Sequence, residues 1–276
     1  MSSHFVFDAQ LPFGVGSRVW WSRNPSGHVL VFVHGFSGKA VGTWSSFPSM
    51  LTRHPKCSGW DLIFFGYDGV HTEAVSSAGD LAELLDAISA SPTELYAKST
   101  SSPSALRQHP DAYTRIVLVA HSLGAIVARR AMLDGYNRST PAPWSKTTEF
   151  FAFAPAHNGA KVMSLVFETF GFAGPVVSLA QLFNQYIVLR DLKEGSGTLQ
   201  ALHDDLRRTY DPPSGASNLR ALEVILARND RIVTNKVLYP DPSPGRGGIL
   251  AGRSHSTVCK PDEAFSQPVD LLVSRL

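Results

Sequence analysis

The sequence predicts a doubly wound α/β protein, in which helices cover both faces of a mostly parallel sheet. Short runs of β-branched, aliphatic and aromatic residues alternate along the chain with longer amphipathic stretches, which is the pattern of strands and crossover helices. Most of the strand-like runs are predominantly apolar, as expected of strands that are buried on both faces. At 276 residues, the chain has the length of one large domain and can bury a full core.

The expected strands are short and apolar. They are residues 17–23, 28–33, 60–67, 115–120, 149–154, 222–227 and 247–251. Residues 24–27, Asn-Pro-Ser-Gly, separate the first two runs and have the composition of a turn. The run 247–251 is brief and glycine-rich, and we expect it to be the last strand of the sheet.

The expected helices have apolar residues on one face. They are residues 43–54, 77–90, 125–131, 199–210 and 261–276. The apolar stripe of the second is formed by residues such as Leu81, Leu84 and Ile88. Residues 91–104 are rich in serine, threonine and proline, and we expect a loop there.

Residues 115–131 combine a buried strand, a sharp turn and a helix. The turn contains residues 120–124, Ala-His-Ser-Leu-Gly. A serine at such a turn holds its hydroxyl out at the carboxyl edge of the sheet, and the N–H of Leu123 can bind an oxyanion. The segment resembles the G-x-S-x-G nucleophile elbow of the α/β-hydrolases, with Ala120 in place of the first glycine. The alternative is that Ser122 only caps the helix.

The resemblance extends to two residues further along the chain. Asp230 follows the expected strand 222–227, where the family places its acid. His255 lies between the last expected strand and the last expected helix, where the family places its base. The order Ser122, Asp230, His255 is the order of the family. A turn aspartate is the alternative for Asp230, and Asp68, after an earlier strand, is the rival acid.

The resemblance also implies an oxyanion hole. Residues 34–36, His-Gly-Phe, follow the expected strand 28–33 and are similar to the H-G-x motif of the family. By that similarity, the backbone N–H groups of Phe36 and Leu123 would bind the oxyanion. The alternative is a plain turn in which His34 is a buried side chain.

Three histidines next to these motifs are candidates for contacting the substrate: His34, His121 and His157. His157 belongs to residues 155–160, Pro-Ala-His-Asn-Gly-Ala. This segment resembles the P-x-x-G bend of a lipase-like branch of the family, which includes lipases and esterases acting on glycerolipids and lipid anchors. His157 precedes the expected acid, so the order of the family would be wrong if it were the base. We therefore expect His157 to line the pocket or to have a structural role.

Residues 161–189 contain only two charged residues, Lys161 at the start and Glu168, among many apolar ones. The segment is long enough to span a membrane, but Gly174-Pro175 and polar residues interrupt it, so we expect two short helices joined by a bend. Hydrolases commonly insert a cap at this place, and residues 158–213 would form one within a single domain of residues 1–276. An apolar cap would line an acyl pocket or dock on lipid. Helices packed on the sheet are the alternative.

Composition limits the remaining possibilities. The net charge is +2 and the chain has no basic run, which disfavours nucleic acid as a partner. Cys57 and Cys259 share no metal-ligand spacing, and two free thiols are favoured over one disulfide. The first ten residues lack the pattern of a signal peptide, so a cytoplasmic location is the default expectation. The oligomeric state is left open.

The motifs together predict a carboxylic ester hydrolase of the esterase or lipase type. Ser122 would be the nucleophile, His255 its base and Asp230 the acid that orients the base. The substrate would be a small-molecule or lipid ester with an apolar part, and the chemistry requires neither a metal nor an organic cofactor. The alternatives are an acyltransferase or thioesterase with the same residues, and a ligand-binding protein on a hydrolase scaffold.

Overall fold

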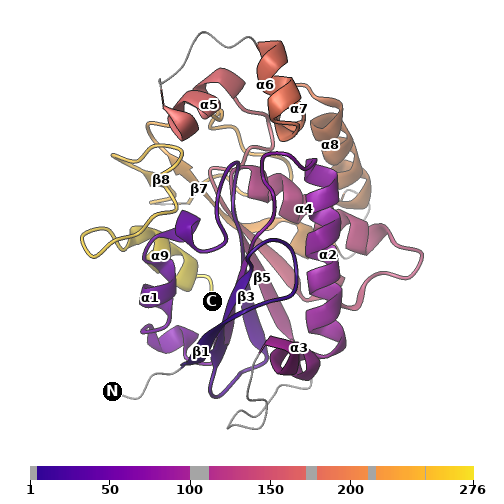
Figure 1. The fold of residues 1–276 in the computed structure, drawn as a ribbon, viewed down its shortest axis with the longest axis vertical. Helices are drawn as coiled ribbons and strands as arrows, with labels where there is room; N and C mark the ends of the chain where they lie inside the picture. Colours follow the sequence, from indigo (N-terminus) through magenta and orange to yellow (C-terminus); the bar gives the residue numbers. More distant parts are fainter. Residues whose placement is uncertain (1–4, 100–111, 172–178, 211–215, 246) are drawn as a thin grey trace.

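The fold is built on one sheet of eight strands (Figure 1). The computed structural model describes residues 5–99, 112–171, 179–210, 216–245 and 247–276. The strands are β1 (Phe5–Gln10), β2 (Arg18–Ser22), β3 (His28–Val33), β4 (Trp60–Phe65), β5 (Arg115–His121), β6 (Thr148–Phe153), β7 (Ala221–Ala227) and β8 (Ile249–Leu250). Each of the seven expected strands is present, and the doubly wound α/β class is confirmed.

The strand order is β1-β2-β4-β3-β5-β6-β7-β8. β1 and β2 pair antiparallel, and so do β2 and β4, whereas all pairs from β4 to β8 are parallel. The chain passes from β3 to β4 on one side and then crosses back to β5 on the other. This reversal places a crevice at the carboxyl ends of β3 and β5, which is where open α/β sheets bind their ligands.

Helices cover both faces of the sheet. They are α1 (Phe47–Leu51), α2 (Ala74–Ala90), α3 (Pro92–Ser99), α4 (Leu123–Asn137), α5 (Val162–Phe170), α6 (Leu179–Gln185), α7 (Val188–Leu192), α8 (Gly197–Tyr210) and α9 (Gln267–Val273). Figure 1 shows α1 and α9 on one side of the sheet and α2, α4 and α8 on the other, with α5, α6 and α7 beyond one end of the strands. That end is the carboxyl edge, because Leu165 of α5 lines a cavity with Ser122, the residue that follows β5.

The sheet interior is closely packed with aromatic side chains. Phe32 of β3 stacks on Phe64 of β4 with ring centroids 4.5 Å apart. Trp44 and Phe47 also pack against Phe32 and against each other. All residues of β4 are buried, and its one charged residue, Asp61, accepts from Ser22 N at 2.7 Å and from the Tyr113 hydroxyl at 2.5 Å. Both cysteines are buried and free, as the sequence predicted.

Prolines account for two differences from the expected helices. The expected helix 43–54 is broken into a 3-10 turn, Gly42–Trp44, and the short α1. Pro48 lies in the first turn of α1, a position that suits a residue without an N–H, whereas it would have interrupted one long helix. The expected helix 261–276 is likewise shortened to α9, whose first turn holds Pro268.

Two further elements were not expected. Residues 92–99 of the expected loop 91–104 form α3, which begins at Pro92 and buries Leu95 and Tyr96. The burial of these two side chains outweighs the loop-like composition, and residues 100–104 lie outside the described part of the chain. β1 was not expected either, and it pairs only with β2 at the edge of the sheet.

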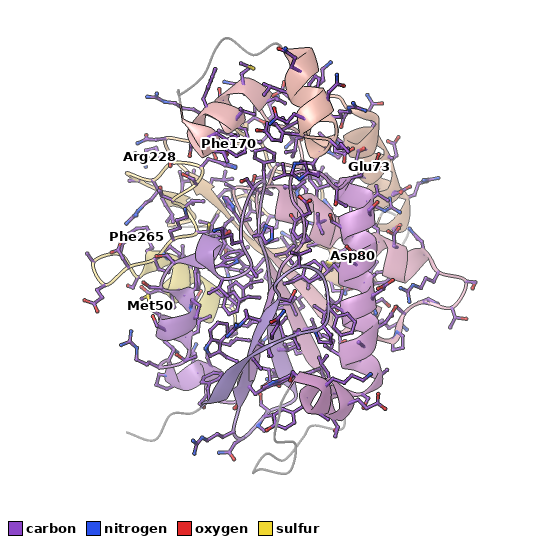
Figure 2. The ribbon with its side chains drawn as sticks, viewed as in Figure 1. Met50, Glu73, Asp80, Phe170, Arg228 and Phe265 are labelled. Atoms are coloured by element: carbon purple, nitrogen blue, oxygen red, sulfur yellow. The ribbon has the colours of Figure 1, made fainter. Side chains whose placement is uncertain are left out.

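Three short helices, α5, α6 and α7, occupy the apolar segment between β6 and β7. The expected bend at Gly174-Pro175 lies outside the described residues. Figure 2 shows Phe170, the last residue of α5, at this end of the molecule. Among the described residues, no helix combines the length and hydropathy needed to cross a bilayer.

Candidate active site

Ser122 is held in a strained backbone conformation at the end of β5. Its φ is 55° and its ψ is −119°, a region that residues other than glycine rarely occupy. The conformation lets the chain turn from strand to helix within one residue. Backbone hydrogen bonds fix the turn: Ser122 donates to Phe153 O at 3.1 Å, and its own carbonyl accepts from Ala156 N at 3.2 Å.

Two glycines allow three segments to meet at this turn. A Cβ on Gly124 would lie 2.2 Å from Val33 O, so only glycine lets α4 approach the end of β3 so closely. A Cβ on Gly35 would lie 2.9 Å from the Cβ of Ser122. The loop after β3 therefore lies directly against the serine, which explains the glycines of both sequence motifs in steric terms.

The structure brings together Ser122, His255 and Asp230. His255 Nε2 lies 2.8 Å from Ser122 Oγ, and His255 Nδ1 lies 2.9 Å from Asp230 Oδ2. The serine follows β5, the aspartate follows β7 and the histidine follows β8, so three parallel strands deliver them to one edge. With Asp230 ionised, Nδ1 carries the proton and Nε2 is left to accept one from the serine.

Asp230 is oriented by three hydrogen-bond partners on its two oxygens: His255 and two backbone N–H groups of the turn that it caps. Its Oδ1 accepts from the backbone N–H groups of Ile232 at 2.8 Å and Val233 at 3.0 Å, and its side chain is fully buried. Burial alone would raise the pKa of Asp230, but the hydrogen bond and charge of His255 and these two amides together lower it. Asp230 therefore stays ionised beside His255.

The sequence predicts the backbone N–H groups of Phe36 and Leu123 as oxyanion donors. Neither donates a hydrogen bond to any acceptor among the described residues. The first N–H groups of a helix have no intrahelical acceptor, which accounts for Leu123 at the start of α4. Phe36 follows Gly35, whose backbone lies against Ser122, and Phe36 lines the same cavity as the serine.

A cavity of about 240 Å³ opens beside Ser122. Its walls come from the loop after β3, from α5 and from the turn that carries His255. Its lining residues are Gly35, Phe36, Ser37, Thr43, His121, Ser122, Leu165, Glu168, Thr169, Ile232, His255, Ser256 and Lys260. Leu165 and Ile232 are apolar, but hydroxyls and two charged side chains make the lining more polar than the expected apolar pocket. In the described part of the chain, no cluster of histidine, cysteine or carboxylate side chains is arranged to hold a metal.

The sequence comparison agrees with this geometry. A model of the alpha/beta hydrolase family matches residues 30–258 of the chain. The chain belongs to the alpha/beta hydrolase family. The resemblance of the nucleophile-elbow segment is thereby confirmed at the level of the family. A comparison with curated proteins finds no match.

Solved structures of other hydrolases share the fold. The mature form of the Bacillus licheniformis lipase BlEst2 has a TM-score of 0.52 at 15% identity, over 88% of this chain and 91% of that one. The siderophore hydrolase EstB of Aspergillus fumigatus has a TM-score of 0.52 at 13% identity, over 100% of this chain and 96% of that one. At such identities the likeness shows the fold alone, and the side chains of this hydrolase must be interpreted from its own geometry.

Of the three histidines expected at the substrate, only His121 lines the cavity of this hydrolase. His121 Nε2 lies 2.9 Å from His255 O, so the ring donates to the backbone of the histidine that contacts Ser122. Burial, together with the charge of His255, lowers the pKa of His121 to about 3. His121 therefore stays neutral and holds the His255 turn in place.

His34 and His157 have structural contacts instead. This corrects the expected substrate contact of His34, and for His157 it selects the structural role from the two that were expected. Tyr67 N–H donates to His34 Nε2 at 3.3 Å, and His34 Nδ1 donates to Gly35 O at 2.9 Å. His157 Nε2 donates to Ala125 O at 3.1 Å. Burial lowers the pKa of each ring to about 4. Both rings pack inside the protein because their neighbouring backbone groups need partners, and neither lines the cavity among the described residues.

The rival acid Asp68 lies apart from this arrangement in the hydrolase. Its carboxylate is bonded to His71, at 3.1 Å from Nδ1, and its side chain is 42% exposed. Sequence reasoning missed Lys260, Ser37 and Thr43 as cavity residues. The sequence distance of Lys260 from His255 is short, which is a signal that could have drawn attention to it, whereas Ser37 and Thr43 are placed by the loop after β3.

Proposed function

We propose that this alpha/beta hydrolase cleaves carboxylic esters through an acyl-enzyme on Ser122. The observation that carries the proposal is the hydrogen-bonded chain from Ser122 through His255 to Asp230, with the serine opening on a cavity. A serine hydroxyl needs a base within hydrogen-bond reach to act as a nucleophile at neutral pH. His255 Nε2 has that position, and no other imidazole nitrogen among the described residues bonds to the serine.

In the first half of the reaction, Ser122 Oγ attacks the ester carbonyl while His255 Nε2 takes its proton. The carbonyl oxygen becomes an oxyanion, which accepts hydrogen bonds from the N–H groups of Phe36 and Leu123. Asp230 stabilises the imidazolium and keeps its orientation. The tetrahedral intermediate collapses, the bond to the alcohol breaks, and His255 gives its proton to the leaving oxygen.

In the second half, water replaces the alcohol. His255 takes a proton from the water, whose oxygen attacks the acyl carbonyl of Ser122. Collapse of this second intermediate breaks the bond to Ser122 Oγ and returns the proton to the serine. The products are a carboxylic acid and the free enzyme, so the atoms balance without a cofactor.

The size of the cavity supports short acyl groups. Its 240 Å³ correspond to roughly eight water-sized groups, at about 30 Å³ each. Phe36, Leu165 of α5 and Ile232, the large apolar residues of the lining, would contact the acyl chain. We propose that residues 158–213 act as a cap, with α5 as its inner wall, so that longer chains require α5 to move. Contact of this segment with a lipid surface stays a prediction.

The test is hydrolysis of 4-nitrophenyl esters from acetate to palmitate by the wild-type protein and by Ser122→Ala. We expect highest kcat/KM for short chains and loss of activity in Ser122→Ala. A fluorophosphonate probe should add one mass equivalent to the wild-type protein and none to the variant. Full activity in Ser122→Ala would contradict the proposal.

Acyl thioesters and added alcohols extend the same assay to the alternative functions. Faster turnover of thioesters than of matched oxygen esters would favour a thioesterase. Ester formation from an added alcohol in preference to hydrolysis would favour an acyltransferase. Thermal stabilisation by an ester that the protein does not hydrolyse would favour a ligand-binding role.

A further inference from the structure

The active-site cavity contains a lysine that ester hydrolysis does not use. Lys260 is half-buried and lines the same cavity as Ser122 and His255. Proton transfer and oxyanion binding are assigned to other groups, so the ammonium has no role in the chemical steps. A charged side chain in such a cavity needs an explanation, because burying part of an ammonium costs free energy unless a partner compensates.

The backbone holds Lys260 in place. It ends the turn that carries His255, in which Val258 N donates to Ser254 O at 3.1 Å and Lys260 N donates to Thr257 O at 3.1 Å. The turn also contacts the loop after β3, since Cys259 Sγ lies 3.8 Å from Thr43 O. The backbone of Lys260 is therefore held at the end of the histidine turn, next to the loop after β3.

No carboxylate of the described residues forms an ion pair with Lys260. Glu168 shares the cavity, but its Oε1 accepts from Ser256 N at 3.1 Å and lies 3.4 Å from Ser254 Oγ. Asp262, two residues after the lysine, pairs with Arg253 at 3.8 Å. Glu168 and Asp262 thus have partners other than Lys260.

The positive charge acts on the cavity itself. Burial is the main cause of the low pKa of His121, followed by His255, and the charge of Lys260 lowers it further. Hydroxyls lie in the same lining, those of Ser37, Thr43 and Ser256. Thr43 Oγ1 accepts from Lys39 N at 2.9 Å, which leaves its own proton to donate. An ammonium with several hydroxyl donors is suited to bind an anionic oxygen group.

We infer that Lys260 is a specificity residue that binds an anionic group of the substrate, a carboxylate or a phosphate carried a few bonds from the ester. The inference deepens the proposed function and rests on it. An apolar acyl chain would contact Leu165 and Ile232, while the anionic group would take the place of the missing carboxylate partner. The substrate class is then a short ester of an acid or alcohol that carries a second, ionised group.

Two matched pairs of esters test this. In the first pair the acyl part differs: mono-4-nitrophenyl glutarate ends in a carboxylate, and 4-nitrophenyl valerate ends in a methyl group. In the second pair the alcohol part differs: 4-acetoxybenzoate is anionic, and its methyl ester is neutral. The kcat/KM of each ester is measured after subtraction of spontaneous hydrolysis, for the wild-type protein and for Lys260→Met, Lys260→Arg and Lys146→Met.

We expect the wild-type protein to prefer the anionic member of at least one pair. Which pair shows the preference tells whether the anionic group belongs to the acyl part or to the alcohol part of the substrate. Lys260→Met should lower kcat/KM for that ester about 10-fold or more and change the neutral one by less than about 2-fold. Lys260→Arg should keep most of the preference. Lys146→Met removes an exposed lysine before β6, at the opposite edge of the sheet. It should change kcat/KM of neither the anionic nor the neutral ester.

The outcomes separate the two proposals. Neutral esters hydrolysed without any anionic preference, or a preference that Lys260→Met leaves intact, would overturn the inference alone. Failure of the wild-type protein to hydrolyse any of the four esters would overturn the proposed function. Unchanged turnover of the neutral ester shows that Lys260→Met has folded. If Lys260→Met does not fold, Lys260→Glu, which reverses the charge, allows the same comparison of anionic and neutral esters. A phosphate-bearing acetate ester run beside 4-acetoxybenzoate distinguishes the two kinds of anion.

Discussion

The two sides of the active site are built in different ways. One side is carried by the sheet: Ser122, Asp230 and His255 follow parallel strands, and their side chains are buried. The other side is α5, where Leu165 is buried but Phe167 and Phe170 are 38% and 46% exposed. Figure 2 shows Phe170 at the end of the molecule, beyond the carboxyl edge of the sheet.

This difference indicates a division of roles. Groups fixed by strands and by close backbone contacts hold the precise distances that proton transfer needs. A helix with exposed apolar residues and few sheet contacts is suited to selecting the substrate, where small displacements are tolerated. Changes on the sheet side should therefore abolish chemistry or folding, and changes on α5 should alter rates and preferences.

The largest effect is expected for Asp230→Asn. The amide can still accept from Ile232 N and Val233 N, so the turn should persist, but His255 would be held in the wrong tautomer. We expect kcat to fall by about 10³–10⁴-fold, measured with a short 4-nitrophenyl ester. Asp68→Asn is the matched control on the exposed rim and should leave kcat unchanged. A larger loss of kcat in Asp68→Asn than in Asp230→Asn would mean that Asp68 is the acid that orients His255.

The next effect concerns how α4 is attached to the fold. Arg129 of α4 and Asp241 form a buried ion pair at 2.6 Å, and the guanidinium lies 4.3 Å from the centre of the Phe150 ring. Arg129→Met would leave the carboxylate buried without its partner and should lower the free energy of unfolding by about 3–5 kcal/mol. Urea denaturation measures it.

The exposed pair Arg138–Asp86, at 2.9 Å, gives the control for that measurement. Arg138→Met should cost about 1 kcal/mol or less. The double variant Arg129→Met/Asp241→Leu should recover part of the loss, since it removes both charges. Equal costs for Arg129→Met and Arg138→Met would show that burial of the pair does not anchor α4.

The sequence predicted the sheet side of the site better than the cavity. The strands were recognisable because they are continuous apolar runs, and Ser122, Asp230 and His255 because each follows a strand in the order of the family. α3 was missed because the burial of Leu95 and Tyr96 is a tertiary effect, which composition does not show.

Lys260 illustrates what sequence reasoning leaves out. The residue lies in a turn shortly after His255, but this short sequence distance alone does not show that it lines the cavity. Its place follows from the packing of that turn on the loop after β3, with Cys259 against Thr43. His34 and His157 show the opposite case. Both lie next to a motif and were candidates for contacting the substrate, but their rings bond to backbone carbonyls.

Buried histidines on the sheet side predict a pH-dependent stability. His34 and His157 have pKa values lowered from 6.5 to about 4, and that of His121 is lowered to about 3, chiefly by burial. Below 6.5 the unfolded chain binds protons that the folded chain does not. The free energy of unfolding should therefore fall as the pH is lowered from 6.5, by about 1.4 kcal/mol per pH unit for each histidine.

The loss should level off for His34 and His157 once the pH is below about 4, and the stability should be fully present above 6.5. Urea denaturation at a series of pH values measures the slope. His157→Gln keeps a side-chain donor for Ala125 O and should reduce the slope by about one proton. A slope that His157→Gln does not change would mean that this ring is not buried as a neutral group.

The smallest effect is expected on the α5 side. Glu168 Oε1 accepts from Ser256 N at 3.1 Å and so connects α5 to the turn that carries His255. The bond is exposed, and its loss should cost little. Glu168→Ala should lower kcat for a neutral short ester by about 3-fold to 10-fold, since freeing the turn misplaces His255 slightly. Glu168→Gln keeps the acceptor and should retain most of the activity. A loss in Glu168→Ala as large as that in Asp230→Asn would make α5 part of the catalytic apparatus and remove the distinction between the two sides.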